Sequence, residues 1–339
     1  MRDDPGLDTD AIAGCLAVQY GIGVSAVTFL PIGYDLNAWV YEVVSTDGAH
    51  SFLKIRSNPV HEPGLRVPRA LLDLGIQHVL APLRTRSKKL WCPLPSYAGY
   101  SVVLYPFVQG ESAMIVGLCD DQWREFGSAL RAVHASQLEP RLRASLRVET
   151  FMLPSAAVVR RVLPLPDGAA VASATAEPFL AFWRAHTESI GQMLARAEDL
   201  GTELRSKTFD DVLCHSDIHA ANILVGEDGR IWLVDWDGPI LAPRERDLLF
   251  VIGSRIARVV TPRDEALFFA GYGTVEIDLT ALIYYRYERI IEDIGEMATS
   301  ILFDPRLSER ARAEAAERVM SVFTQGGAIE QAEVVVRQG

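Results

Sequence analysis

The chain has 339 residues, of which 49% are hydrophobic and 23% are charged, and its formal net charge at pH 7 is −11. This length predicts two lobes rather than one small domain, and the composition is ordinary for a soluble globular protein. The acidic balance argues against a nucleic-acid partner, which needs a basic face, and is compatible with a small cationic ligand.

The cysteines and the N-terminus indicate the cellular compartment of the protein. Cys15, Cys92, Cys119 and Cys214 are widely spaced and form no C-x-x-C pair, so we expect reduced thiols in a cytoplasmic protein. The first residues lack the layout of a signal peptide, and no apolar run is long enough to cross a membrane. The sequence leaves the oligomeric state open.

The first 108 residues read as a helix followed by a set of strands. The expected elements are a helix over 9–20, strands over 24–30, 38–44, 52–55, 79–82 and 101–107, and a helix over 62–74. Asp47-Gly48 between the second and third strands is a strong hairpin signal. A strand that ends in Pro106 and is followed by Gly110 suits a hinge over about 104–110, where the chain near Tyr105 and Phe107 would bind an adenine.

Two further features of this region predict contacts with a nucleotide. Lys54 lies in the apolar run 52–56; such a lysine often only solubilises an edge strand, but it is also the residue type that binds α- and β-phosphates and pairs with Glu62 on a helix. The loop 31–37, with Tyr34 and Asn37, would then cover the phosphates. An ordinary hairpin loop remains the alternative for this segment.

After residue 109 the sequence is mainly helical. Apolar residues at helical spacing predict a core-facing helix over 121–138, and further helices are expected over 177–206, 248–260 and 308–323. The stretch 139–176 is rich in Pro and Ala and reads as an irregular insertion. Asp247 stands at the start of an expected helix, where we expect a structural function, either as an N-cap or as a buried carboxylate that braces the loop around His215.

The stretches 214–225 and 233–237 carry the strongest functional signal. His215, Asp217 and Asn222 follow the order H-x-D-x-x-x-x-N in a polar loop between two apolar runs, and Asp235 stands at the exit of the second run. Phosphoryl transfer requires a carboxylate beside the attacking hydroxyl and oxygen ligands for Mg²⁺. We therefore expect Asp217 to act as the base, and Asn222 and Asp235 to hold the metal. Simple turn chemistry is the alternative, but it does not explain the order of these side chains.

A helix expected over 284–294 is the candidate substrate element. One of its faces is apolar and is expected in the core: Ile283, Tyr287, Ile290 and Ile294. An adjacent stripe carries Tyr285, Glu288 and Glu292, which together with Asp237 are assigned to a cationic substrate. The alternative is a solvated acidic face, because charged stripes on helices usually face water.

Four blocks of the sequence resemble the aminoglycoside phosphotransferase family of kinase-like small-molecule enzymes: 34–38, 213–225, 234–248 and 284–294. The resemblance implies an α+β, bilobal, protein-kinase-like fold with a small lobe built on a mainly antiparallel sheet and a large, mostly helical lobe. The lobes would be an ATP-binding lobe over 1–108 and a catalytic and substrate-binding lobe over 109–339. It also implies ATP or another nucleoside triphosphate at the hinge, Mg²⁺, and an aminocyclitol antibiotic as phosphoryl acceptor. The sequence departs from the family pattern around Glu62, where prolines disturb the helix, and after Gln109.

Three other functions compete with this interpretation. A protein kinase is disfavoured because no Ser, Thr or Tyr occurs between Asp235 and Gly253, where an activation loop would lie. A non-catalytic nucleotide-binding module usually lacks one of the lysine, base or metal ligands. A kinase of another small alcohol, such as a sugar, an amino alcohol or a biosynthetic aminocyclitol, remains the main alternative.

Overall fold

The computed structural model describes residues 4–33, 37–57, 59–164, 173–305, 307–324 and 328–333. These residues form two compact units, each made of several stretches of the chain. Unit 1 comprises 1–147, 213–241 and 256–274, and unit 2 comprises 148–212, 242–255 and 275–339. This division by compactness differs from the predicted functional division at residue 108, which stays a prediction.

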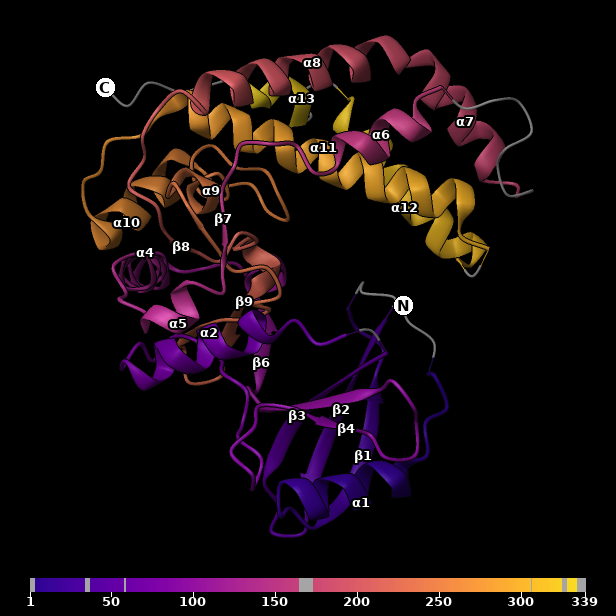
Figure 1. The fold of residues 1–339 in the computed structure, drawn as a ribbon, viewed down its shortest axis with the longest axis vertical. Coiled ribbons are helices and arrows are strands. Elements are labelled where there is room, and N and C mark those ends of the chain that lie inside the picture. Colours follow the sequence, from indigo (N-terminus) through magenta and orange to yellow (C-terminus); the bar gives the residue numbers. More distant parts are fainter. Residues whose placement is uncertain are drawn as a thin grey trace. The chain divides into compact units, whose positions relative to one another are not determined.

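An antiparallel sheet forms the N-terminal part of unit 1 (Figure 1). Its order is β1-β2-β3-β5-β4, and its strands are β1 (Val24–Leu30), β2 (Ala38–Ser45), β3 (His50–Arg56), β5 (Ser101–Pro106) and β4 (Cys92–Pro93). Side chains alternate between the faces of a strand, so Leu53 and Ile55 enter a buried cluster while Lys54 points to the other side. Helix α1 (Thr9–Gln19) covers that cluster with Ile12 and Leu16.

The predicted helix at the N-terminus and most of the strands are confirmed, with ends shifted by one or two residues. The exception is the strand expected over 79–82, where the structure has only an isolated parallel bridge between Val79 and Leu233. Helix α2 (Glu62–Asp73) contains two prolines: Pro63 lies in its first turn, where an N–H has no helical partner, and Pro68 lies inside the helix. Gly64 allows this turn to approach the backbone of Trp236: a Cβ there would lie 2.6 Å from the Trp236 carbonyl oxygen.

The remaining elements of unit 1 support the polar loop. A small antiparallel sheet has the order β10 (Ile231–Leu233), β9 (Ile223–Gly226) and β6 (Gly110–Ser112). Helix α4 (Asp120–His134) packs against α10 (Pro262–Tyr272), and Gly127 allows their close approach because a Cβ there would lie 2.0 Å from the Phe268 carbonyl oxygen. The short elements are α3 (Ala113–Val116), α5 (Pro140–Arg143) and η1 (Ala220–Asn222).

Unit 2 is built around the long helix α11 (Leu279–Phe303), which begins at the N-cap Asp278 (Figure 1). The helices that accompany it are α6 (Ala156–Val162), α7 (Ala176–Ala185), α8 (Thr187–Leu204), α9 (Glu245–Leu248), α12 (Glu309–Val322) and α13 (Ala328–Ala332). The buried Arg312 of α12 donates to the carbonyl oxygens of Ile301 and Asp304, so it satisfies acceptors that the end of α11 leaves unpaired.

A third sheet has the order β7 (Arg147–Val148), β11 (Ile240–Ala242) and β8 (Val212–Cys214), and each of its strands contains a boundary between the two units.

Two expectations about the chain after residue 138 are wrong. No helix runs over 248–260: α9 ends at Leu248, and turns follow in which Leu249, Phe250 and Val251 are buried. The described part of 139–176 is more regular than expected, since it contains α5, β7 and α6. Asp247 is fully buried within α9, whose N-cap is Arg244, so the N-cap form of its expected structural function is excluded.

No helix in the described ranges combines the length and the apolar character that crossing a bilayer requires.

Candidate active site

The polar loop after β8 is fixed by hydrogen bonds of its own side chains. His215 is fully buried; its Nε2 donates to the Val234 carbonyl oxygen at 2.9 Å, and its Nδ1 accepts from the Asp217 N–H at 3.3 Å. Ser216 has a left-handed backbone with φ of 73°, and its hydroxyl donates to the Gly238 carbonyl oxygen at 2.7 Å. These bonds tie the loop to the segment that carries Asp235 and leave the Asp217 side chain 39% exposed.

Asn222 connects the two halves of the motif. Its side-chain nitrogen donates to the backbone oxygen of Asp217 at 2.8 Å and to the Asp217 carboxylate at 3.2 Å. Its backbone oxygen accepts from the N–H of Val234 at 3.0 Å, directly before Asp235. The structure therefore brings Asp217, Asn222 and Asp235 together, as the sequence predicted.

Lys54 joins this group through ion pairs. Its ammonium lies 2.9 Å from Asp235 Oδ1 and 3.1 Å from Asp237 Oδ2. Burial alone would lower the pKa of Lys54, but the two carboxylates outweigh that effect and hold the pKa above its usual value. Burial likewise acts to raise the pKa of Asp237, and Lys54 and Arg56 together keep it below its usual value. Lys54 and Asp237 are thus both charged at neutral pH.

The backbone at Asp235 is unusual for an ordinary residue. Its φ is 63°, in the left-handed region that residues other than glycine rarely adopt, although Asp and Asn tolerate it best. Trp236, the next residue, is buried, and its ring lies 4.4 Å from that of His215. Asp235 and Asp237, on either side of Trp236, both contact Lys54, and backbone strain of this kind concentrates at functional sites.

The oxygen atoms of this group suit a magnesium ion. With its nitrogen bonded to Asp217, the Asn222 amide keeps its oxygen for another partner, and no hydrogen bond reaches that oxygen from the part of the chain that the structure describes. Asp235 uses one oxygen for Lys54 and retains the other. Mg²⁺ prefers such hard oxygen ligands and takes only one or two from the protein, with waters and phosphates completing its shell.

The predicted partner of Lys54 on helix α2 behaves differently. Glu62 is exposed, and within the described residues Lys54 pairs with Asp235 and Asp237 and not with Glu62. Glu62 is the first residue of α2 and directly precedes Pro63 in the first turn. A nucleotide-binding role for Glu62 stays a prediction.

Three of the other predicted nucleotide contacts, Asn37, Tyr105 and Phe107, lie on or next to strands of the antiparallel sheet. Tyr34 lies outside the described residues. Asn37 is exposed, and its carbonyl oxygen accepts from the N–H of Ser57 at 2.8 Å. Tyr105 pairs with Phe52 across β5 and β3, and burial raises the pKa of its hydroxyl. Phe107 follows β5, with its ring 5.9 Å from that of His50.

The predicted substrate stripe lies on α11 in unit 2. Tyr285 and Glu288 are buried and Glu292 is half-buried, so the stripe is not the solvated acidic face of the alternative interpretation. Arg246 was not among the predicted site residues. It donates to Glu288, and to Glu149 at 3.2 Å. Its guanidinium lies over the Tyr285 ring, 5.2 Å from the ring centroid. A protein cation thus occupies the position beside Glu288 that we expected an ammonium of the substrate to take.

Two carboxylates share the one arginine in this cluster. Burial raises the pKa of Glu288 to about 7, with Glu149 adding to the effect and Arg246 opposing it. Arg246 Nε and the Tyr284 hydroxyl are buried and find no hydrogen-bond partner among the described residues. The cluster therefore retains polar groups that a further donor or acceptor can satisfy.

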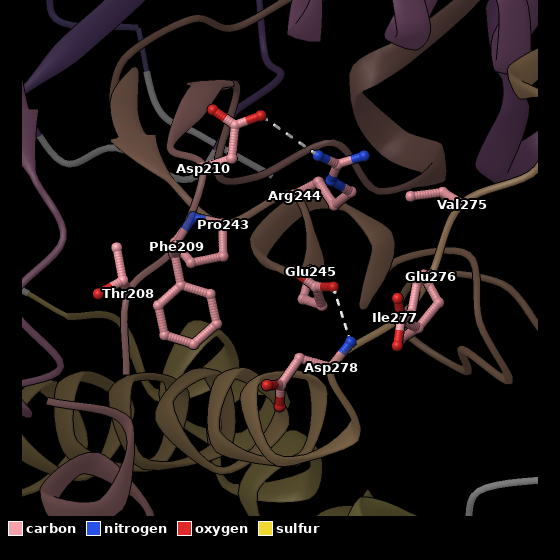
Figure 2. Close-up of a pocket in the computed structure, with 10 residues that line it drawn as sticks. All are labelled: Thr208, Phe209, Asp210, Pro243, Arg244, Glu245, Val275, Glu276, Ile277 and Asp278. Carbon is pink, nitrogen blue, oxygen red and sulfur yellow. Dashed lines mark hydrogen bonds and ion pairs between the residues drawn. The ribbon is translucent and has the colours of Figure 1, made fainter. Parts of the chain in front are cut away.

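A pocket of about 340 Å³ also lies within unit 2, and its walls come from the segments 208–210, 243–245 and 275–278 (Figure 2). None of the predicted site residues lines it. Its buried acid, Glu245, accepts the N–H of Asp278 at 3.0 Å, and Asp278 is the N-cap of α11. Glu245 thus has a structural function at the start of that helix.

A lysine on an antiparallel sheet that contacts an aspartate, beside a loop in which a second aspartate is hydrogen-bonded to an asparagine, is typical of the class of kinase-like phosphotransferases. Residues 28–285 match the phosphotransferase enzyme family, and the chain belongs to that family. It is a small-molecule phosphotransferase. A comparison with curated proteins gave no match.

Solved structures with the same fold include two of spectinomycin phosphotransferase APH(9)-Ia. The one in complex with ADP and spectinomycin is 29% identical, with a TM-score of 0.84, covering 97% of this chain and 98% of that one. The AMP-bound one is 28% identical, with a TM-score of 0.81, covering 97% and 99%. Amicoumacin kinase hAmiN, in complex with AMP-PNP, Ca²⁺ and Ami, is 16% identical with a TM-score of 0.61, covering 96% and 93%, and shares the fold alone. The predicted fold class is confirmed.

Proposed function

We propose that this enzyme transfers the γ-phosphoryl group of ATP, or of another nucleoside triphosphate, to a hydroxyl of an aminocyclitol antibiotic, with spectinomycin as the acceptor. The observation that carries the chemistry is the hydrogen-bonded and ion-paired group of Lys54, Asp217, Asn222 and Asp235 within one unit. The choice of acceptor is supported by the similarity, over 97% of the chain, to a phosphotransferase crystallised with spectinomycin. Such a reaction would serve antibiotic resistance in the cytoplasm.

Each member of the group has one part in this reaction. Asp217, held in place through Asn222 and His215, accepts the proton of the acceptor hydroxyl and orients its oxygen toward the phosphoryl group. Lys54 binds the phosphates. Asn222 and Asp235 hold Mg²⁺, which, when bound, neutralises charge on the phosphate oxygens.

The nucleotide would bind in a lobe formed by residues 1–108, with its base at the hinge over 104–110. Tyr105 and Phe107 are the proposed contacts at the base. Tyr34 and Asn37 are the proposed contacts over the phosphates, and Glu62 is the proposed helix partner of Lys54. The lobe formed by residues 109–339 would bind the acceptor.

The acceptor would be recognised as a cation. The proposed contacts are Asp237, Tyr285, Glu288 and Glu292. Two acidic groups, Glu288 and Glu149, contact the single cation Arg246. An ammonium group of the substrate that approached this cluster would therefore form charge-assisted hydrogen bonds, which are stronger than neutral ones.

Turnover of ATP with purified enzyme and a panel of acceptors tests this proposal. The panel contains spectinomycin, other aminocyclitols, simple sugars and amino alcohols, and we expect phosphorylation of spectinomycin with the highest kcat/KM. Preferred turnover of a sugar or an amino alcohol would contradict the antibiotic assignment and leave the chemistry intact. Binding of nucleotide without turnover of any acceptor would contradict the enzyme's proposed reaction.

The matched variant is Asp217→Asn, which keeps the size and most hydrogen bonds of the side chain and removes its basicity. We expect turnover to fall by about two to four orders of magnitude, the usual contribution of a general base, while ATP affinity measured by calorimetry stays near that of the wild type. His219→Asn, a change at the side chain whose Nε2 lies 3.4 Å from Asp217, is the control for an alternative base. A larger loss in the His219 variant than in the Asp217 variant would reverse the assignment.

A further inference from the structure

A second cation lies beside Lys54 on strand β3. Residues two apart on a strand point to the same face, so Arg56 projects on the side of Lys54, while Leu53 and Ile55 are fully buried on the other side. The sequence holds this signal in the run 52–56, where the two basic residues alternate with apolar ones. Arg56 belongs neither to the motif around Asp217 nor to the predicted metal ligands, Asn222 and Asp235.

Arg56 and Lys54 share one carboxylate. Arg56 Nη1 lies 3.0 Å from Asp237 Oδ1 and 3.1 Å from Asp237 Oδ2, and the latter oxygen is also 3.1 Å from the Lys54 ammonium. Lys54 in turn reaches Asp235 at 2.9 Å. Two cations and two carboxylates are thus linked in one chain, from Arg56 through Asp237 and Lys54 to Asp235.

The chain of charges has a buried side and an exposed side. The side chains of Arg56 and Lys54 are 13% and 15% exposed, whereas those of Asp237 and Asp235 are 42% and 49% exposed. The two cations are therefore fixed among protein atoms. Asp237 contacts both cations, so the share of its charge that Arg56 neutralises determines how strongly Asp237 attracts the Lys54 ammonium.

This sharing has a consequence for a phosphate ligand. If Arg56 were absent, the whole charge of Asp237 would fall on Lys54, and phosphate oxygens would have to compete with two carboxylates for one ammonium. We propose that Arg56 is a positioning residue of the phosphotransferase: by neutralising Asp237 it leaves Lys54 available to the phosphates of the nucleotide. The inference rests on the proposed phosphate-binding function of Lys54.

The first test is the affinity of the full-length enzyme for ADP in EDTA, measured by isothermal titration calorimetry, so that no metal contributes. We expect Arg56→Gln to weaken ADP binding about tenfold, the effect of redistributing one charge-assisted hydrogen bond, and to raise the KM for ATP with kcat little changed. Arg56→Lys, which retains the charge, should recover most of the affinity. Wild-type affinity in Arg56→Gln would overturn the inference. If that variant does not fold, Asp237→Asn alone replaces it: removal of the carboxylate should strengthen ADP binding, and unchanged or weaker binding would overturn the inference.

The second test separates positioning from direct contact with phosphate. Removal of the carboxylate by Asp237→Asn should restore the ADP affinity of Arg56→Gln to within about threefold of the wild type, because Lys54 then has one anion fewer to hold it. If Arg56 bound the phosphates itself, the double variant would remain as weak as Arg56→Gln, and the inference would be wrong.

Lys54→Met distinguishes this inference from the proposed function. A large loss of ADP affinity in Lys54→Met, with none in Arg56→Gln, would refute the positioning function alone. An unchanged ADP affinity in Lys54→Met would refute the phosphate-binding function of Lys54 and, with it, the function inferred for Arg56. Melting temperatures of all variants, read by circular dichroism, identify any loss that comes from unfolding.

Discussion

The buried Glu288 on α11 predicts a pH dependence of stability that a single substitution removes. Its pKa in the folded protein is about 7, against 4.5 for a free glutamate side chain. Between these values the folded state keeps a proton that the unfolded state has released, so the free energy of unfolding falls as the pH rises. At about 1.36 kcal/mol per pKa unit, this one group lowers stability by about 3 kcal/mol between about pH 4.5 and pH 7.

The glutamine introduced by Glu288→Gln does not titrate, so this variant does not lose free energy of unfolding in this way as the pH rises. We expect its free energy of unfolding, minus that of the wild type, to rise by about 3 kcal/mol from pH 4.5 to pH 8, most of it below pH 7. Urea unfolding followed by circular dichroism at intervals of half a pH unit measures the difference, in which the other titrating groups cancel. Exchange of the carboxylate for an amide beside Arg246 adds an offset that does not depend on pH.

The exposed Glu188, in the first turn of α8 of the same unit, supplies the matched control. Glu188→Gln should follow the wild type at every pH. A difference between Glu288→Gln and the wild type that stays constant from pH 4.5 to pH 8 would refute the argument, because it would mean that the carboxylate is not desolvated in the folded protein.

Other variants test the candidate site directly. Asp235→Ala should abolish turnover and make nucleotide affinity independent of Mg²⁺, as measured by calorimetry with and without EDTA; surviving metal dependence would assign the ligand to another carboxylate. Gly64→Ala places a Cβ 2.6 Å from the Trp236 carbonyl oxygen, so we expect it to destabilise the protein by about 1–3 kcal/mol and to reduce turnover, whereas unchanged melting would argue against this close packing. Glu292→Gln should raise the KM for the acceptor several-fold with the KM for ATP unchanged, and a wild-type KM for every active acceptor would remove Glu292 from the substrate site.

The sequence predicted those parts of the fold whose signal is local. The alternation around Lys54 and the turn at Asp47-Gly48 define adjacent strands of the sheet, because side-chain direction and turn chemistry depend on neighbouring residues. The run after Leu248 shows the limit of this reasoning. Its residues are buried as an apolar run should be, but they form turns, and apolar content alone predicts burial without predicting a helix.

The same limit applies to the candidate site. Asp217, Asn222 and Asp235 could be found because a short motif holds them at fixed spacing. Arg246 could not, because its partner Glu288 lies 42 residues along the chain and no periodicity connects them. Arg56 is intermediate: its direction follows from the strand, whereas its carboxylate partner, 181 residues away, is known only from the structure.

The left-handed backbone at Asp235 limits which mutations can be accepted at that position over evolutionary time. Glycine, asparagine and aspartate adopt this conformation with little strain, whereas alanine, glutamate and β-branched residues adopt it with more. Of the three favoured residues, only aspartate provides a charged oxygen ligand. Drift at position 235 should therefore lead first to well-folded, inactive proteins carrying asparagine or glycine. A relative with asparagine at this position would have lost its chemistry while keeping its fold.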